Sequence, residues 1–195
     1  MNTPTHMIIG AAFFAKRDQT KSLIAAYAGG IAPDLPMLIM VTYATRIAGI
    51  PQKEVFETLF FSKAWQEVFS IDHSFFVWGV LLAIGLVLRN VPISAFAGSA
   101  LAHAIVDFFT HHSDARQQFW PLTDWVFRSP VSYWDPAYFG TIMGPIEAML
   151  VIGLAIIIVI RSSRLWERIL TISIALVFLA PIAITGGFHG LHGLG

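Results

Sequence analysis

Four long apolar runs constrain this chain more than any other feature of its sequence. A helix of about 20 apolar residues crosses the hydrocarbon core of a membrane, and slightly fewer suffice when aromatic anchors flank it. Two weaker apolar stretches precede the runs, at residues 7–15 and 22–50, and the segment APDLP interrupts the second. We therefore expect an all-α, polytopic membrane bundle with about five or six membrane-embedded helices, some short or broken. The four runs cover residues 74–88, 93–109, 142–160 and 169–185.

The composition agrees with a membrane protein and excludes several other classes. Charged residues make up 12% of the 195 residues, roughly half of the ~25% that is usual in soluble domains. Zero net charge without a basic block argues against nucleic acid and leaves membrane lipids as the expected partner. The chain has no cysteine, so any metal must be held by nitrogen and oxygen ligands. The opening MNTPTHMIIG lacks a basic n-region, and we expect no removable signal peptide.

The chain shows no internal repeat and no linker, which predicts a single integral-membrane domain over residues 1–195. Residues 51–70 carry apolar pairs that change face near residue 62, a pattern that favours a bent interfacial helix. Residues 113–140 contain three prolines and many aromatic residues. This composition excludes one continuous helix and is typical of a folded loop at the depth of the lipid headgroups.

Basic residues concentrate in three short connections between the apolar runs. The positive-inside rule places such connections in the cytoplasm, which fits a bacterial cytoplasmic (inner) membrane. With that topology all seven histidines fall toward the opposite face, so we expect the functional site on the non-cytoplasmic side. The basic residues concerned are Lys16, Arg17, Lys21, Arg89, Arg161, Arg164 and Arg168.

A stripe of His103, Asp107 and His111 follows from their spacing of four residues. On one helix such residues share a face, with Cβ atoms about 6 Å apart. The stripe can place two or three ligands on one divalent metal, with zinc bonds of about 2.0–2.2 Å. Carboxylates inside a membrane are costly unless they are paired, and they usually mark functional sites. The alternative is a hydrogen bond between His103 and Asp107 that serves only helix packing.

Further ligands have to come from elsewhere in the bundle. His6, Asp34 and His73 are the best-placed suppliers, since each lies at the end or break of an apolar run. His112 and Asp114 follow the stripe directly. In the alternative interpretation Asp34 initiates a turn, His73 starts a helix, and the other residues are solvated.

We expect one or two divalent ions, with zinc favoured by this nitrogen and oxygen ligand set. Asp34, Asp107 or Asp114 is expected to act as a catalytic base or to orient a ligand. Glu147 is a further candidate ligand or base, and Asp72 another outside candidate. The sequence leaves the roles of His189 and His192 open.

Two arginines lie within the aromatic segment 113–140. Arg116 and Arg128 suit a lid over the site, where a guanidinium binds a phosphate or carboxylate group. The alternative is an interfacial cap that packs on the bundle and is ordered by ion pairs.

Several motifs resemble the YdjM-like family of predicted membrane-bound metal-dependent hydrolases. They are TPTHMIIG, GGIAPDLP, IDHSFF and HAIVDFFTHH, and the resemblance covers residues 1–140. Their order of His, Asp, His, H-x3-D and His is also similar to that of zinc-dependent phospholipases C and single-strand nucleases. The later H-x3-E/D pair and the N-terminal tryptophan ligand of those enzymes are missing, so a complete trinuclear site is not expected. The resemblance implies as ligands His6, Asp34, His73, His103, Asp107 and either His111 or His112.

The leading interpretation is a membrane-bound metal-dependent hydrolase that acts on a lipid or headgroup ester through metal-activated water. The alternative is a non-enzymatic membrane protein, either a metal or proton transporter or a structural partner. A transporter should continue its polar residues toward Arg89, whereas the run 74–88 offers none. Lipid phosphatases also use H-x3-D, but their upstream Ser-Arg pair and Pro-Ser-Gly-His segment are absent.

Overall fold

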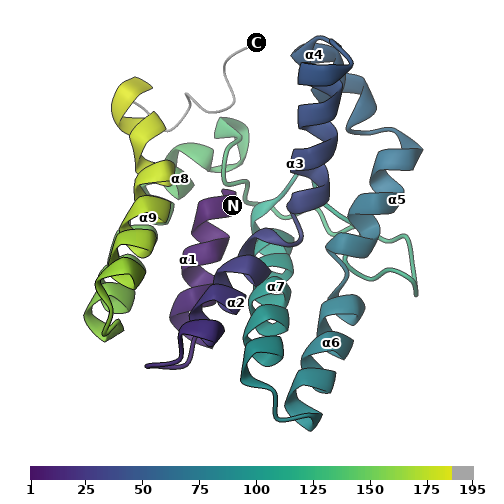
Figure 1. Ribbon diagram of the computed structural model, residues 1–195. Coiled ribbons are helices and arrows are strands. Elements are labelled where there is room, and N and C mark those ends of the chain that lie inside the picture. Colours follow the sequence, from purple (N-terminus) through teal and green to yellow (C-terminus); the bar gives the residue numbers. More distant parts are fainter. Residues whose placement is uncertain (186–195) are drawn as a thin grey trace.

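The computed structural model describes residues 1–185, and every regular element in this range is helical (Figure 1). The all-α prediction is confirmed, while His189 and His192 lie outside the described residues. Two π-helical turns, η1 (Tyr43–Ile47) and η2 (Val55–Leu59), and the 3-10 turn η3 (Pro136–Tyr138) interrupt the α-helices. The α-helices are α1 (Thr3–Phe14), α2 (Thr20–Ile31), α3 (Leu35–Thr42), α4 (Gln52–Glu54), α5 (Lys63–Asp72), α6 (Phe75–Val87), α7 (Val91–Thr110), α8 (Gly140–Arg161) and α9 (Leu165–Thr185).

Four helical segments are long and apolar enough to cross a membrane. They are Lys63–Val87, which joins α5 and α6, and Val91–Thr110, Gly140–Arg161 and Leu165–Ile184. Helix α2 and the helix Leu35–Ile47 meet at an angle of 57°, and together they form a fifth, broken span or a re-entrant loop. The bend falls at the APDLP segment, where the sequence predicted an interruption. Helix α1 has 12 residues and rises only about 18 Å, too little to cross the hydrocarbon core.

The segment predicted as a bent interfacial helix is helical and does break, between η2 and α5, at residues 60–62. Its second half differs from the expectation, because α5 combines with α6 into a segment of 25 residues that is long enough to span. Lys63, Gln66 and Glu67 make the start of this segment polar. For this reason the sequence did not indicate that α5 belongs to the same span as the apolar run that follows.

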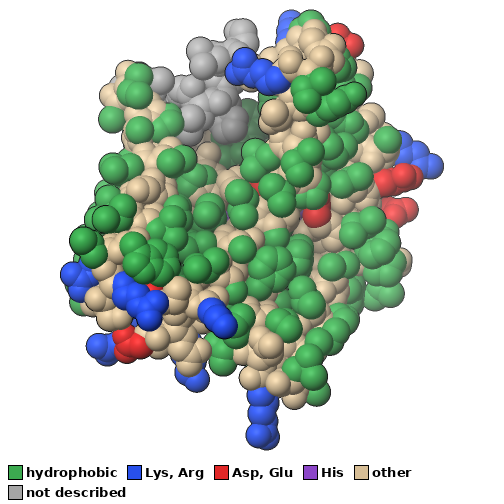
Figure 2. Space-filling model, in the orientation of Figure 1, with side chains coloured by type: hydrophobic (Ala, Val, Ile, Leu, Met, Phe, Trp, Pro, Cys, Tyr) green, Lys and Arg blue, Asp and Glu red, His purple; other side chains and the backbone are tan. Residues whose placement is uncertain are grey.

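The outer surface carries the apolar side chains that a lipid-facing bundle requires. Hydrophobic groups cover the middle of the molecule in Figure 2, and basic groups gather at its lower end. An apolar surface of this extent is unusual for a protein surrounded by water. Exposed examples on α8 and α9 are Ile142, Met149, Ile160, Leu165, Leu176 and Ile184.

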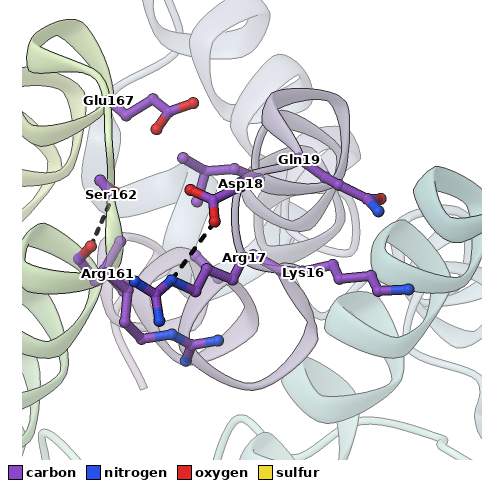
Figure 3. A pocket seen from close by; sticks show the side chains of 11 residues that line it. Lys16, Arg17, Asp18, Gln19, Arg161, Ser162 and Glu167 are labelled. Atoms are coloured by element: carbon purple, nitrogen blue, oxygen red, sulfur yellow. Dashed lines mark hydrogen bonds and ion pairs between the residues drawn. The ribbon is translucent and has the colours of Figure 1, made fainter.

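The three basic connections lie together at one end of the bundle (Figures 1 and 2). A pocket opens at this end between the α1–α2 loop and the α8–α9 turn (Figure 3). Arg17 and Asp18 form an ion pair of 3.6 Å beside it, and Nη1 of Arg161 donates to the carbonyl oxygen of Ala12 at 3.1 Å. The clustering agrees with the predicted topology, in which these connections are cytoplasmic.

Helix α1 occupies the middle of the bundle, where it contacts α2, α7, α8 and α9. Its side chains join an apolar core that includes Ile8, Ala26, Val151 and Phe178, all nearly inaccessible to solvent. Burying α1 on all sides holds its first turns, and the polar residues on them, at a fixed place within the membrane-spanning helices.

Candidate metal centre

Four interruptions of the helical bundle meet at one level (Figure 1). They are the first turns of α1, the bend between α2 and α3, the break between α5 and α6, and the C-terminal end of α7. Helix ends and breaks leave backbone and side-chain polar groups free of the regular hydrogen-bond pattern, and membrane proteins tolerate them where they line a polar site.

Four residues bring one potential ligand atom each to this level. Asp34, His73, His103 and Asp107 are all buried, and their four ligand atoms lie within 4.8 Å of one another. Nε2 of His103 is 3.2 Å from Oδ2 of Asp107 and 3.5 Å from Oδ1 of Asp34. Nε2 of His73 is 3.6 Å and 3.9 Å from the same two oxygens. Ligand atoms on a tetrahedral ion with bonds of about 2.0–2.2 Å are separated by about 3.3–3.6 Å, so the cluster closely matches the size of such a site.

Both imidazoles are anchored through Nδ1, which fixes the nitrogen that faces the cluster. Nδ1 of His73 donates to Oδ1 of Asp72 at 2.5 Å, and Nδ1 of His103 donates to the carbonyl oxygen of Gly30 at 2.8 Å. Because these oxygens only accept, the proton lies on Nδ1 and Nε2 carries the lone pair. Neither Nε2 atom has a hydrogen-bond partner within residues 1–185. A backing hydrogen bond of this kind is the usual support of a metal-ligating histidine.

Gly30 matters because α1 passes directly over it. A Cβ atom at this position would lie 2.5 Å from Cα of Met7 and 2.8 Å from the carbonyl oxygen of His6. Only glycine allows the two backbones to approach this closely. The same close approach brings His6 face to face with His103, with ring centroids 3.6 Å apart.

Asp34 lies in the turn between α2 and α3, as the alternative interpretation expected, but its side chain faces the cluster. It occupies the N-cap position of α3, yet its side chain makes no capping hydrogen bond. Instead Oδ2 accepts from Oγ1 of Thr3 at 2.5 Å, which leaves Oδ1 facing the two histidines. A tilt of the carboxylate toward the cluster, rather than toward the helix backbone, is what a ligand requires.

Asp107 connects the four-residue cluster to two further histidines. Its Oδ2 belongs to the cluster, while its Oδ1 lies 2.9 Å from Nε2 of His6 and 3.1 Å from Nε2 of His111. The amino group of Met1 also donates to this oxygen at 2.7 Å. His6 and His111 therefore stand beside the cluster and contact it through Asp107, rather than sharing its ligand-sized geometry.

The C-terminal end of α7 separates the two neighbouring histidines that the sequence could not distinguish. His111 caps the helix, and Nδ1 of His111 lies 2.9 Å from Oδ2 of Asp114. His112 points away: its Nδ1 donates to the carbonyl oxygen of Ser129 at 2.7 Å, and its ring stacks on Tyr138. The expectation of His112 as a ligand is therefore replaced by a role in holding the loop.

Asp114 is not among the cluster residues, but its surroundings strongly favour the ionised form of its carboxyl group. Burial raises the pKa of Asp114, but the nearby His111 imidazole and Arg116 guanidinium outweigh it and bring the pKa to about 2. Burial lowers the pKa of His111, whereas Asp107 and Asp114 raise it, with a net increase. Asp114 therefore stays ionised at the rim of the site, beside the His111 imidazole.

The aromatic loop packs over the end of α7 through backbone hydrogen bonds and ring contacts. The amide of Ser129 donates to the carbonyl oxygen of His111 at 3.0 Å, and the amide of Tyr133 donates to Thr110 at 2.9 Å. Phe127 stacks on Phe108 with centroids 4.5 Å apart. This arrangement differs from a cap ordered by ion pairs. Arg128 is exposed, whereas Arg116 is buried.

Glu147 holds α8 against the start of α1. Its two carboxylate oxygens accept from the amide and Nδ2 of Asn2 at 2.8 and 3.0 Å, and from Oγ1 of Thr5 at 2.6 Å. These three hydrogen bonds occupy both oxygens and fix the helix that carries His6. The structure therefore gives Glu147 a positioning role and does not bring it into the cluster.

Sequence reasoning named Asp72 only as an outside candidate ligand or base, and it did not identify the supporting carbonyl group of Gly30. Asp72 directly precedes His73 in the chain, and this adjacency was a usable signal for a carboxylate that orients an imidazole. The carbonyl group of Gly30 left no signal, because every residue has one and only the packing of α2 against α7 presents it to His103.

Comparison with models of known protein families, with curated proteins and with solved structures found no match to this chain. The ligand assignments above therefore depend on the geometry of the cluster alone.

Proposed function

We propose that this protein binds a divalent cation, with zinc favoured, within the helical bundle and uses it to hydrolyse an ester of a lipid or lipid headgroup. The cation ligands are Asp34, His73, His103 and Asp107. A cation bound there would lower the pKa of a water molecule toward neutrality and polarise the ester oxygen. Asp114 and His111 form the polar rim through which protons exchange.

The observation that carries this proposal is the pair of unpartnered Nε2 atoms on His73 and His103, each facing the same two carboxylates. Two buried carboxylates repel each other and lose their hydration, so their proximity needs positive charge nearby. The Met1 amino group supplies one such charge on Oδ1 of Asp107, while the oxygens that face the two histidines have none from the described part of the chain. A protonated imidazole would aim its Nε2–H at one carboxylate oxygen. Neither histidine has such a directed hydrogen bond, whereas an ion at the centre satisfies all four atoms.

Along α7, the helix that carries His103 and Asp107, the buried residues favour an enzyme over a transporter. Between His103 and the basic end, the buried residues of α7 are small, and the only hydroxyl among them, on Ser99, donates to the carbonyl oxygen of Ala26. An ion path needs polar groups that continue across the membrane. The small residues concerned are Ala95, Ala97, Gly98, Ser99 and Ala100.

The test combines metal content with ester hydrolysis. The full chain, purified in detergent without chelator, is expected to carry about one zinc per chain, or two if Asp107 bridges a second ion. Zinc-loaded protein should release product from short-chain phospholipids, and Asp107→Asn should not. Separate detection of fatty acid and of the released headgroup identifies the bond that is cleaved. Stoichiometric metal without turnover of any ester would reduce the proposal to a metal-binding membrane protein.

A further inference from the structure

A buried arginine next to the cluster has donors that nothing in the described chain satisfies. Arg116 is 3% exposed, and its guanidinium lies between the rings of Phe60 and Phe69, 4.6 and 4.4 Å from their centroids. Among the described residues, the one hydrogen-bond partner of Nη2 is the sulfur atom of Met37, at 3.6 Å. Nε and Nη1 have no hydrogen-bond partner among residues 1–185.

The contacts of Arg116 place it one helical turn from two of the proposed ligands. Met37 follows Asp34 by three residues at the start of α3, and Phe69 precedes His73 by four residues on α5. Residues three or four apart on a helix are neighbours on one face. The two aromatic rings hold the guanidinium plane by cation–π contacts, within about one helical turn of Asp34 and His73.

A second polar side chain of the same loop is buried without partners. Gln118 is completely inaccessible to solvent, and both its Oε1 and its Nε2 lack a hydrogen bond. Its backbone carbonyl accepts from the amide of Phe75 at 2.9 Å, two residues beyond His73. Arg116 and Gln118 thus lie against the two helix breaks that supply Asp34 and His73.

Arg116 has the charge of Asp114 nearby, but Nε and Nη1 of Arg116 and both amide atoms of Gln118 are buried without hydrogen-bond partners among the described residues, which is unfavourable unless a ligand pairs with them. The guanidinium fork matches two oxygens of a carboxylate or phosphate group. A carboxylate has only two oxygens, and the fork would use both. A phosphate group has four oxygen atoms. These are enough to accept from the guanidinium fork and from the amide of Gln118, and also to reach the adjacent cation site. The chemistry therefore favours a phosphate group.

We propose that Arg116 and Gln118 form a phosphate-binding subsite beside the cation site, so that the substrate is a phosphate ester. This inference rests on the proposed function and specifies its substrate class. The phosphate group belongs either to a lipid headgroup or to a free phosphate compound, and the two sources share the same recognition chemistry. Arg128, the other arginine of the loop, is exposed and does not contribute.

The experiment uses the zinc-loaded full chain in detergent and measures phosphate affinity by calorimetry. The probes are inorganic phosphate, dihexanoylphosphatidic acid, dihexanoylglycerol and acetate. We expect both phosphate probes to bind, and the other two not to bind. Binding of the lipid probe at least tenfold tighter than inorganic phosphate identifies a lipid source, and equal binding identifies a free phosphate compound.

The decisive variants are Arg116→Met, which keeps the side-chain length without the charge, and Gln118→Leu. Hydrogen bonds to charged groups predict a loss of phosphate affinity of roughly tenfold or more for Arg116→Met and of severalfold for Gln118→Leu. The matched control Arg46→Met removes an exposed arginine, and its affinity should stay within about twofold of the wild type, since isolated surface charges contribute little.

Zinc content is measured in the same samples, so the two proposals fail separately. Wild-type protein without zinc contradicts the proposed function, while a zinc-loaded wild type that binds neither phosphate probe overturns the subsite. Equal phosphate binding by Arg116→Met and Arg46→Met, or acetate binding as tight as phosphate, also overturns it. If Arg116→Met does not fold, the wild-type titration and Gln118→Leu still decide the question.

Discussion

The carboxylate of Asp72 accepts a hydrogen bond of 2.5 Å from Nδ1 of His73, the residue that follows it. This bond turns Nε2 of His73 toward Asp34 and Asp107, 3.9 and 3.6 Å away. Two adjacent residues at the break between α5 and α6 therefore form one unit, in which the carboxylate orients the imidazole.

Loss of this orientation should weaken metal binding without removing a ligand. We expect Asp72→Ala to lower zinc affinity by about 10- to 100-fold, the usual effect of removing a carboxylate behind a ligating histidine. Asp72→Asn should lose less, because the amide oxygen still accepts from Nδ1. Competition with a chromophoric chelator measures the affinities. The control is Asp124→Ala, at an exposed position, and an Asp72→Ala affinity equal to this control would contradict the assignment.

The close approach of α1 to Gly30 should be as important as a ligand. Gly30→Ala places a Cβ 2.5 Å from Cα of Met7, so α1 and α2 must separate, and a shift of α2 displaces the Gly30 carbonyl that supports His103. We expect zinc affinity to fall by about tenfold, in line with the loss of a supporting hydrogen bond. Gly79→Ala is the control, since a Cβ there meets nothing within 4 Å. Equal affinities of the two variants would show that the approach is not required.

The two neighbouring histidines at the end of α7 offer a comparison with the ligand His103. His103→Ala removes a nitrogen of the cluster and should lower bound zinc to less than about one tenth of the wild-type amount, because four-coordinate sites rarely form with a ligand missing. His112→Ala should retain the metal, since His112 is bonded to Ser129 instead. Elemental analysis after gel filtration measures both. A His112→Ala protein that loses its zinc would place this histidine back in the site.

Part of the candidate site could be predicted from the sequence. The H-x3-D spacing predicted the pair His103 and Asp107 because helical geometry alone places them on one face. The APDLP segment predicted an interruption, and His73 was expected at the start of an apolar run. In the structure Asp34 and His73 both lie at helix breaks and belong to the cluster.

The remaining features depended on tertiary packing. Sequence could not choose between His111 and His112, since the choice depends on where α7 ends and how the loop returns to Ser129. Nor could the sequence show that Arg116 is buried between Phe60 and Phe69, because both phenylalanines lie far before Arg116 in the chain. The contact of Glu147, on α8, with the start of α1 also depends on tertiary packing, so the sequence could not show it.

Glu147 is expected to stabilise the bundle without binding the metal. Glu147→Leu leaves three donors of Asn2 and Thr5 without an acceptor, at a cost of about 3 kcal/mol in the free energy of unfolding. The unfolding midpoint should fall by about 6 °C or more, while zinc per chain at saturation stays unchanged. Glu147→Gln keeps one acceptor oxygen and should lose less. Reduced zinc content in folded Glu147→Leu would instead identify Glu147 as a ligand.

Removal of the cation should destabilise the wild type more than a variant without the cluster. A ligand present at about 100 times its Kd stabilises the folded state by about 2.7 kcal/mol, which corresponds to about 5 °C or more in the unfolding midpoint of a chain this size. We expect a strong chelator to lower the wild-type midpoint by this amount and to leave His103→Ala unchanged. Equal shifts in the two proteins would mean that the chelator acts elsewhere.

The most direct measurement is a crystal structure of protein purified without chelator, with diffraction data collected at the zinc absorption edge. We predict an anomalous peak about 2.0–2.2 Å from Nε2 of His73 and of His103, with carboxylate oxygens of Asp34 and Asp107 at similar distances. No peak at this position, together with Nε2 of His103 donating directly to a carboxylate oxygen, would contradict the account.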